Sequence, residues 1–354
     1  MKRLASLSTL VFCMLMLNYV IAQPEVNGGP INVPSNGVID GVFIQEHIPT
    51  KKMVPLESVR EADVIWNRQI FQTIDLREKI NHPLYYPFDE INGDEWVRNS
   101  TRWSLWTIIR NSIIEGDNLT VYDNENPNSL GKFDGDQFKY PIVSNSIGGN
   151  YKNDSILKKN INRVLGYESE PKVDENGNFI ALTSIIDPES DSLDINGNPV
   201  YPPRDMIWIT SRDIVAYQLK ENWFFDKERS VMDVRIIGIA PVVYFSEKNR
   251  PITTDLQTGA LSDKIFTQRP LFWLYYPQLR YIINNYFVYN SDNESQWMSF
   301  DDLFLKRKFN STIIKESNNY DRNIESYRTG IDALMESEKI KDEIRNIEHD
   351  MWSF

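Results

Sequence analysis

Val231-Met-Asp-Val-Arg-Ile-Ile-Gly-Ile-Ala-Pro-Val-Val-Tyr-Phe245 is a run rich in β-branched and aromatic residues. Such side chains favour β-structure, so the run predicts a pair of strands or one long bent strand. Pro241 lies inside it and has no backbone N–H to donate, which predicts an edge position or a bulge at that point. Further strands are expected on both sides of this run, at 118–123, 138–143, 206–210 and 271–276.

Helices are expected to alternate with these strands. Apolar residues recur every four positions over 60–80, at Trp66, Ile70 and Ile74, and again after Ser211, at Val215, Leu219 and Trp223. This spacing predicts one apolar helix face in each segment. Other helices are expected at 94–114, 153–165, 299–317, where Ser299 and Asp302 form a capping box, and 330–351. The sequence therefore predicts an α+β protein with mixed or antiparallel sheets, about six helices, an extended N-terminal arm and an amphipathic C-terminal helix.

The chain divides by composition into four parts. Residues 1–22 have the pattern of a cleaved signal peptide, and the Pro- and Gly-rich residues 23–58 predict an extended arm. Residues 59–325 form the α+β core. One interpretation divides this core into two similar halves, 59–165 and 204–325, joined by a hairpin-rich segment. Residues 326–354 predict a charged amphipathic helix.

The first segment predicts export. Lys2 and Arg3 precede an almost uninterrupted apolar run, and cleavage is expected between Ala22 and Gln23. The alternative is an uncleaved anchor. Cys13 is interpreted as an ordinary apolar position, because the bulky Phe12 before it does not fit a lipidation motif. Cleavage would leave 332 residues without cysteine and with a net charge of −14.

Composition excludes several kinds of function. Fifty acidic residues against 38 basic ones give a charge of −12, which disfavours non-specific binding to nucleic acid. One Cys and three His exclude a disulfide scaffold and cysteine-based metal sites, so no metal or cofactor is expected. The sequence contains no nucleophile elbow, phosphate-binding loop or dinucleotide-binding glycine pattern. No catalytic residue is therefore predicted.

Short motifs leave two questions open. Asn-Gly turns within 174–178 and 194–198 predict hairpins; the competing calcium-loop interpretation lacks the required glycine, because Phe179 and Pro199 occupy its place. Asp-Ser-aliphatic triplets make Ser155 and Ser192 candidates for O-glycosylation of an exported protein.

Longer stretches resemble a known family. They are Asp40-Gly-Val-Phe-Ile-Gln-Glu-His-Ile-Pro-Thr50, Arg60-Glu-Ala-Asp-Val-Ile-Trp66, Ile74-Asp-Leu-Arg-Glu-Lys-Ile-Asn-His-Pro-Leu-Tyr-Tyr-Pro87, Arg269-Pro-Leu-Phe-Trp-Leu-Tyr-Tyr-Pro277, Ser299-Phe-Asp-Asp-Leu-Phe-Leu-Lys-Arg-Lys-Phe309 and Lys315-Glu-Ser-Asn-Asn-Tyr-Asp-Arg322. In this order they resemble the GldN/PorN family of gliding-motility proteins over about 38–325.

The resemblance implies a periplasmic component of the type IX secretion system of Bacteroidetes, associated with the outer membrane. It implies self-association into a ring, an outer-membrane lipoprotein partner of the GldK/PorK type, and the proton-driven GldL/GldM motor as a further partner. It assigns no catalytic residue. The competing interpretations are an exported glycan-binding protein or a carboxylate glycosidase.

Three segments are candidates for partner contact. The first lies in 38–58, where a segment without a fold of its own suits docking onto a neighbour; the alternative is that it covers the core of its own chain. The second is a compact basic run that could meet an acidic partner or form a solvated helix face. The third is the apolar face of the last helix. The candidate residues are Val42, Phe43, Ile44, His47, Ile48, Lys306, Arg307, Lys308, Ile340, Ile344 and Ile347.

Overall fold

The computed structural model describes residues 53–169 and 204–352, except for 93–94, 117–118, 128, 130, 147, 255–260, 294–295 and 297. The signal peptide, most of the arm, both predicted Asn-Gly hairpins and Ser192 lie outside these residues. The described part contains six helices and antiparallel sheets, which confirms the predicted α+β class. The helices are α2 (His82–Tyr85), α3 (Leu105–Glu115), α4 (Ser155–Leu165), α5 (Tyr276–Ile283), α6 (Phe300–Leu305) and α7 (Ile331–Trp352).

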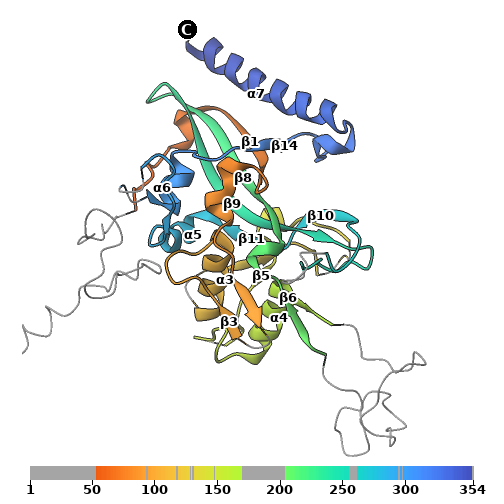
Figure 1. The fold of residues 1–354 in the computed structure, drawn as a ribbon. Helices are drawn as coiled ribbons and strands as arrows, with labels where there is room; N and C mark the ends of the chain where they lie inside the picture. Colours follow the sequence, from red (N-terminus) through yellow and green to blue (C-terminus); the bar gives the residue numbers. More distant parts are fainter. Residues whose placement is uncertain are drawn as a thin grey trace, which may run out of the picture.

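One eight-stranded antiparallel sheet dominates the molecule, in the order β14–β1–β8–β9–β11–β4–β5, with β10 also paired to β9 (Figure 1). Its strands come from both predicted halves of the core, and the division into halves stays a prediction. Three two-stranded ribbons, β2–β3, β6–β7 and β12–β13, complete the described strands. The bounds are β1 (Val64–Asp75), β2 (Glu90–Asn92), β3 (Glu95–Val97), β4 (Val121–Asp123), β5 (Pro141–Ile142), β6 (Gly166–Glu168), β7 (Met206–Trp208), β8 (Ile214–Asp226), β9 (Val231–Phe245), β10 (Thr267–Pro270), β11 (Phe272–Tyr275), β12 (Phe287–Val288), β13 (Met298–Ser299) and β14 (Thr312–Glu316).

The run Val231–Phe245 forms a single long strand, β9, which confirms the second of the two expected forms. Pro241 lies where the neighbour of β9 changes from β11 to β10, and its carbonyl oxygen accepts a hydrogen bond from the Leu271 amide at 2.9 Å. The N–H that proline lacks would point to the same side of the strand as this carbonyl. Pro241 therefore falls at a break in the ladder on that side, which is where a proline costs least.

Two predicted helices are strands. Segment 60–80 forms β1, and the segment after Ser211 forms β8; the two pair along almost their whole length. The helix prediction was wrong because a spacing of four residues is also a multiple of two. Ile70 and Ile74 would therefore share one face of a strand as well as one face of a helix. Both side chains are fully buried, Ile74 in the main core and Ile70 in a cluster with α7. The β-branched and aromatic residues of both segments favour the strand.

Two other helices are shorter than predicted. The segment 94–114 contributes strand β3 before α3, which begins after Ser104; its Oγ accepts a hydrogen bond from the Thr107 amide at 3.2 Å. The capping box of Ser299 and Asp302 is confirmed at the start of α6, but α6 ends at Leu305 instead of about 317. The β-branched residues that follow form β14 beside β1. The remaining predicted strands, the helix at 153–165 and the last helix are confirmed.

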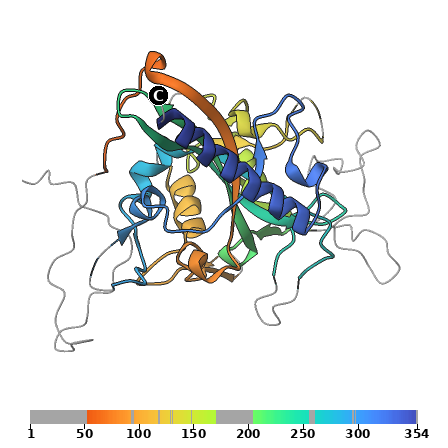
Figure 2. The ribbon, with the colours of Figure 1, turned by 90° about the horizontal axis from the view of Figure 1, so that it is seen from above.

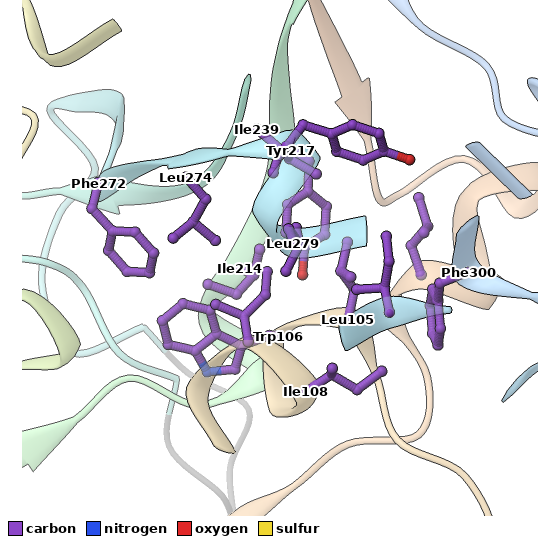
Figure 3. Packing of buried hydrophobic residues seen from close by; sticks show 14 of the residues in the cluster. Leu105, Trp106, Ile108, Ile214, Tyr217, Ile239, Phe272, Leu274, Leu279 and Phe300 are labelled. Carbon is purple, nitrogen blue, oxygen red and sulfur yellow. The ribbon is translucent and has the colours of Figure 1, made fainter. Parts of the chain in front are cut away.

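The main core lies between one face of the sheet and helices α3, α5 and α6. Figure 3 shows side chains from α3, such as Trp106, meeting β8, β9 and β11 through Ile214, Ile239 and Phe272. The indole Nε1 of Trp106 donates to the carbonyl of Ile209 at 3.2 Å, so the ring is buried with its polar atom satisfied. A smaller cluster around Phe71 and Trp273 covers the opposite face.

A buried ion pair joins α5 to α6. The Nε and Nη2 atoms of Arg280 donate to the two carboxylate oxygens of Asp301 at 2.7 and 2.9 Å. Their side chains are only 3% and 2% exposed. Arg280 Nη2 also donates to the carbonyl of Val54 at 2.8 Å, which fixes the described end of the N-terminal arm to the core. The arm thus covers its own chain at this point.

Helix α7 lies across the strands at one end of the sheet (Figures 1 and 2). Ile340 and Ile344 are buried with Ile70 and Ile313 in a separate cluster. The Ser337 hydroxyl accepts a hydrogen bond from the Ile313 amide at 2.9 Å. Strand β14 is the last strand on this side of the sheet. The Ser337 hydroxyl of α7 therefore pairs with an edge amide that could otherwise bind the strand of another chain.

Candidate functional site

The described residues contain no group of three or more His, Cys, Asp or Glu side chains arranged to hold a metal ion. Within the same residues, no helix has the length and apolar character needed to cross a membrane. Clefts and surfaces that could bind another molecule are the remaining candidates for a functional site among these residues.

A cleft of about 870 Å³ lies beside α4. Its walls come from α4, the β6–β7 ribbon, the chain after β4, and the β9 and β10 strands. Charged, polar and aromatic side chains line the cleft; they include Asp123, Phe133, Ser155, Arg163, Glu168, Phe245 and Arg269.

Three of the charged side chains of this cleft form ion pairs within the described chain. Arg163 Nη2 lies 2.6 Å from Asp123 Oδ2, and Glu168 forms an exposed pair with Arg204. Arg269 lies over the rings of Phe133 and Phe245, 4.5 and 4.2 Å from their centroids, and donates to Asn249 Oδ1. Burial lowers the pKa of Arg269.

The glycosylation candidate Ser155 lies at the rim of this cleft and is exposed. The preceding Asp154 caps α4, because its Oδ1 accepts hydrogen bonds from the amides of Ile156 and Leu157 at 2.9 and 3.2 Å. A hydrogen bond from the Ser144 hydroxyl lowers the pKa of the Asp154 carboxyl. The Asp-Ser pair thus has a structural role at a helix start, and glycosylation at Ser155 stays a prediction.

The three residues of the basic run after α6, Lys306, Arg307 and Lys308, have different surroundings. Arg307 forms an ion pair with the fully buried Glu221, with Nη1 2.8 Å from Oε1, and Lys308 pairs with Asp292. Glu221 also accepts hydrogen bonds from Gln72 and Trp223. Arg307 therefore serves the interior of its own chain, whereas Lys306 is exposed.

The candidate contact residues of the last helix are Ile340, Ile344 and Ile347. Ile340 and Ile344 pack inside the chain, as described above, and Ile347 is half-buried. Instead, the start of α7 exposes Ile331, Leu334 and Met335, with exposed fractions of 78%, 51% and 65%. Val42, Phe43, Ile44, His47 and Ile48 lie outside the described residues.

An alternating stack of arginines and aromatic rings surrounds the start of α3. The guanidinium carbon of Arg110 lies 5.3 Å from the ring centroid of Trp208 and 4.6 Å from that of Trp96. Arg98 lies 4.7 Å from Trp96 and 4.8 Å from Trp103. The stack continues from Trp103 to Tyr286, whose rings are 5.5 Å apart and nearly parallel.

Arg110 is the most unusual member of the stack. It is 4% exposed, and its Nε and Nη1 atoms are buried without a hydrogen-bond partner. Burial lowers its pKa to about 10, an effect that the charge of Asp89 only partly offsets. The oxygens of Asp89 bind the Trp96 indole and the Ser211 amide, each at 2.7 Å.

None of the residues of this stack was predicted as a site residue from the sequence. A local signal was present, because Trp96-Val-Arg98 and Arg102-Trp103 alternate arginine with tryptophan just before α3. The other rings, Trp208 and Tyr286, come from segments about 100 or more residues away, so only the fold brings them together.

These observations define an antiparallel α+β protein whose described surface offers a cleft, an exposed apolar helix start and an arginine–aromatic stack for binding. The family model described as gliding motility associated protein GldN matches residues 59–353, and the chain belongs to this family. This confirms the resemblance found in the sequence. No curated protein matches the chain. Membership makes the protein a component of the gliding and type IX secretion machinery of the periplasm.

Proposed function

We propose that this protein is a non-enzymatic scaffold of the type IX secretion and gliding machinery. In this proposal its signal peptide exports it to the periplasm. There it forms a ring together with an outer-membrane lipoprotein of the GldK/PorK type and couples that ring to the GldL/GldM-type inner-membrane motor. The observation that carries the proposal is the family match over 59–353.

The geometry supports a role in assembly. The start of α7 presents three exposed apolar side chains, Ile331, Leu334 and Met335, and Tyr320 and Tyr327 just before it are also exposed. Exposed apolar side chains that lie together are a feature of interaction sites. A contact of this kind between unlike surfaces of successive copies closes into a ring when the rotation between copies is suitable.

The decisive experiment is co-expression with a GldK-type lipoprotein, followed by light scattering on the purified material. The expected result is a megadalton-scale complex that contains both chains. Replacing Leu334 and Met335 by Asp should reduce the complex to smaller species, because a charge in an apolar contact is costly. Lys339→Asp adds the same charge elsewhere on α7 and should leave the complex intact. Recovery of a lone monomer from the unmodified pair would contradict the scaffold function and favour the glycan-binding and glycosidase interpretations.

The N-terminal arm needs a separate deletion. Removing residues 38–52 takes away Val42 to Ile48 but keeps Val54, whose carbonyl binds Arg280. If the arm contacts the lipoprotein, the shortened chain should remain folded but no longer co-purify with it. Co-purification at the unmodified level would show that the arm makes no essential contact.

A further inference from the structure

The arginines around the start of α3 differ from most others in the chain in their electrostatic partners. Arg212, Arg229 and Arg280 each meet a carboxylate, at 3.2, 2.8 and 2.7 Å. Arg98, Arg102 and Arg110 form no ion pair with any described residue. A chain with 50 acidic residues and 38 basic ones has carboxylates in excess, so three neighbouring arginines without one stand out.

Two of these arginines have side chains that a ligand could reach. Arg98 and Arg102 are exposed. Arg98 is stacked on Trp96 and Trp103 and donates one hydrogen bond, to Asn111 Oδ1. The guanidinium of Arg102 lies 5.1 Å from the ring centroid of Tyr289, and its side chain donates to no described residue. Stacking holds each guanidinium plane while leaving edge N–H groups for an acceptor, and a carboxylate matches this fork with two oxygens.

The third arginine, Arg110, adds charge beneath these two. It contacts the same Trp96 ring as Arg98 and is held without a single hydrogen bond from Nε or Nη1. A buried unpaired cation destabilises a fold, and contact with two rings offsets this only in part. Functional sites often contain residues that lower the stability of the fold, because binding or catalysis requires them.

We propose that the surface formed by Arg98, Arg102, Trp103 and Tyr289, hereafter the arginine–aromatic surface, binds an acidic segment of a partner protein. Carboxylates of that segment pair with Arg98 and Arg102, and its apolar or aromatic side chains pack on the exposed edges of the rings. Arg110 is a positioning residue that fixes Trp96 under Arg98. The inference goes beyond the scaffold proposal, because it concerns direct binding by the chain alone and stands whether or not a ring forms.

The overall charge favours a short protein segment over an anionic membrane. A chain with a charge of −12 is repelled by an extended anionic surface such as lipid headgroups. A short segment meets mainly the local positive charge, since salt screens charges beyond about 8 Å. Figure 1 shows β3, which leads into this surface, and α7 at opposite ends of the molecule. A segment bound here would leave α7 accessible to a second contact.

The test uses the purified mature chain and a fluorescein-labelled octapeptide of alternating glutamate and tyrosine, followed by fluorescence anisotropy. The expected result is saturable binding that weakens as salt is added and that is lost when glutamine replaces glutamate in the peptide. Arg98→Gln combined with Arg102→Gln should raise Kd at least tenfold. Both side chains are exposed, so the fold should survive; an unchanged melting temperature checks this.

Arg322→Gln is the matched control. Arg322 is also exposed, stacks on Tyr320 and Tyr327 at 5.0 and 4.8 Å from their centroids, and has no ion pair with a described residue. Its substitution should change Kd less than twofold. An equal loss in the control variant would show non-specific charge attraction and overturn the proposal. So would tight binding to phosphatidylglycerol vesicles that needs Arg98 and Arg102 while the peptide fails to bind.

Discussion

Two arginines of this molecule are equally buried and differently held. Arg280, between α5 and α6, places two donors on the carboxylate of Asp301 and one of them also on a backbone carbonyl. Arg110, on α3, lies over the rings of Trp96 and Trp208, and its Nε and Nη1 atoms have no hydrogen-bond partner among the described residues. The hydrogen bonds of Asp301 raise the pKa of Arg280, whereas burial lowers that of Arg110.

The two arginines differ in whether a carboxylate balances the buried charge at hydrogen-bond distance. A buried cation that is paired with a carboxylate has its charge balanced inside the chain, and removing it destabilises the fold. A buried cation that is stacked on aromatic rings and has no described carboxylate within ion-pair distance, as at Arg110, keeps a positive charge that Asp89 offsets only in part. Substitutions at the two positions should therefore change stability in opposite directions.

The largest effect is expected for Arg280→Met, which leaves Asp301 as a buried charge without a partner. Its free energy of unfolding should fall by about 3–5 kcal/mol, measured by urea denaturation. Arg280→Met combined with Asp301→Leu should recover most of this loss, because both buried charges are then gone. Arg163→Met, which breaks an exposed pair, is the control and should cost under about 1 kcal/mol. A loss under about 1 kcal/mol for Arg280→Met would show that the buried pair with Asp301 does not stabilise the fold more than an exposed pair does.

Trp96→Leu should have the next largest effect. It removes a ring that contacts both Arg98 and Arg110, and an indole donor that binds Asp89 at 2.7 Å. We expect a loss of roughly 2–3 kcal/mol from packing and the lost hydrogen bond. In the Arg110→Met background the same substitution should cost less, because no cation then depends on the ring. Equal costs in the two backgrounds, by double-mutant cycle, would contradict a stacking role for Trp96.

Arg110→Met should raise the free energy of unfolding by about 1 kcal/mol near neutral pH. The substitution removes a charge whose pKa is lowered to about 10 from its usual 12.5 and replaces it by an apolar chain of similar length. That shift corresponds to a cost of roughly 3 kcal/mol in the unmodified chain, which the substitution removes. The substitution also removes the favourable contacts with two rings, so the net gain is smaller. Differential scanning calorimetry should show a higher melting temperature. A lower one would mean that the stack is a net source of stability.

The smallest effect concerns pH. Because the folded pKa of Arg110 lies below its unfolded value, the unfolded state binds more protons above pH 10, and folding gains stability as pH rises through that value. The advantage of Arg110→Met over the unmodified chain should therefore shrink by up to about 1 kcal/mol between pH 8 and pH 10.5. Comparing the two proteins cancels the titration of lysines and tyrosines elsewhere. A difference that stays constant over this range would show that Arg110 keeps an ordinary pKa.

The sequence predicted local structure best where local signals were sufficient. The capping box at Ser299, the helix over 153–165 and the long strand ending at Phe245 all follow from side chains within a few residues of each other. It failed at β1 and β8, because a four-residue spacing fits a helix face and a strand face equally well. The partner that settles the choice for each strand is the other one, about 150 residues away.

The candidate sites follow the same division. The sequence alone determined the fold class, the apolar face of the last helix and the stretches that resemble the GldN family. Only the tertiary structure decided that Ile340 and Ile344 face their own chain, that Arg307 neutralises Glu221, and that Trp208 stacks on Arg110. The physical reason is that helix caps and turn residues act within a few positions. Burial and charge pairing instead depend on which distant segments meet when the sheet forms.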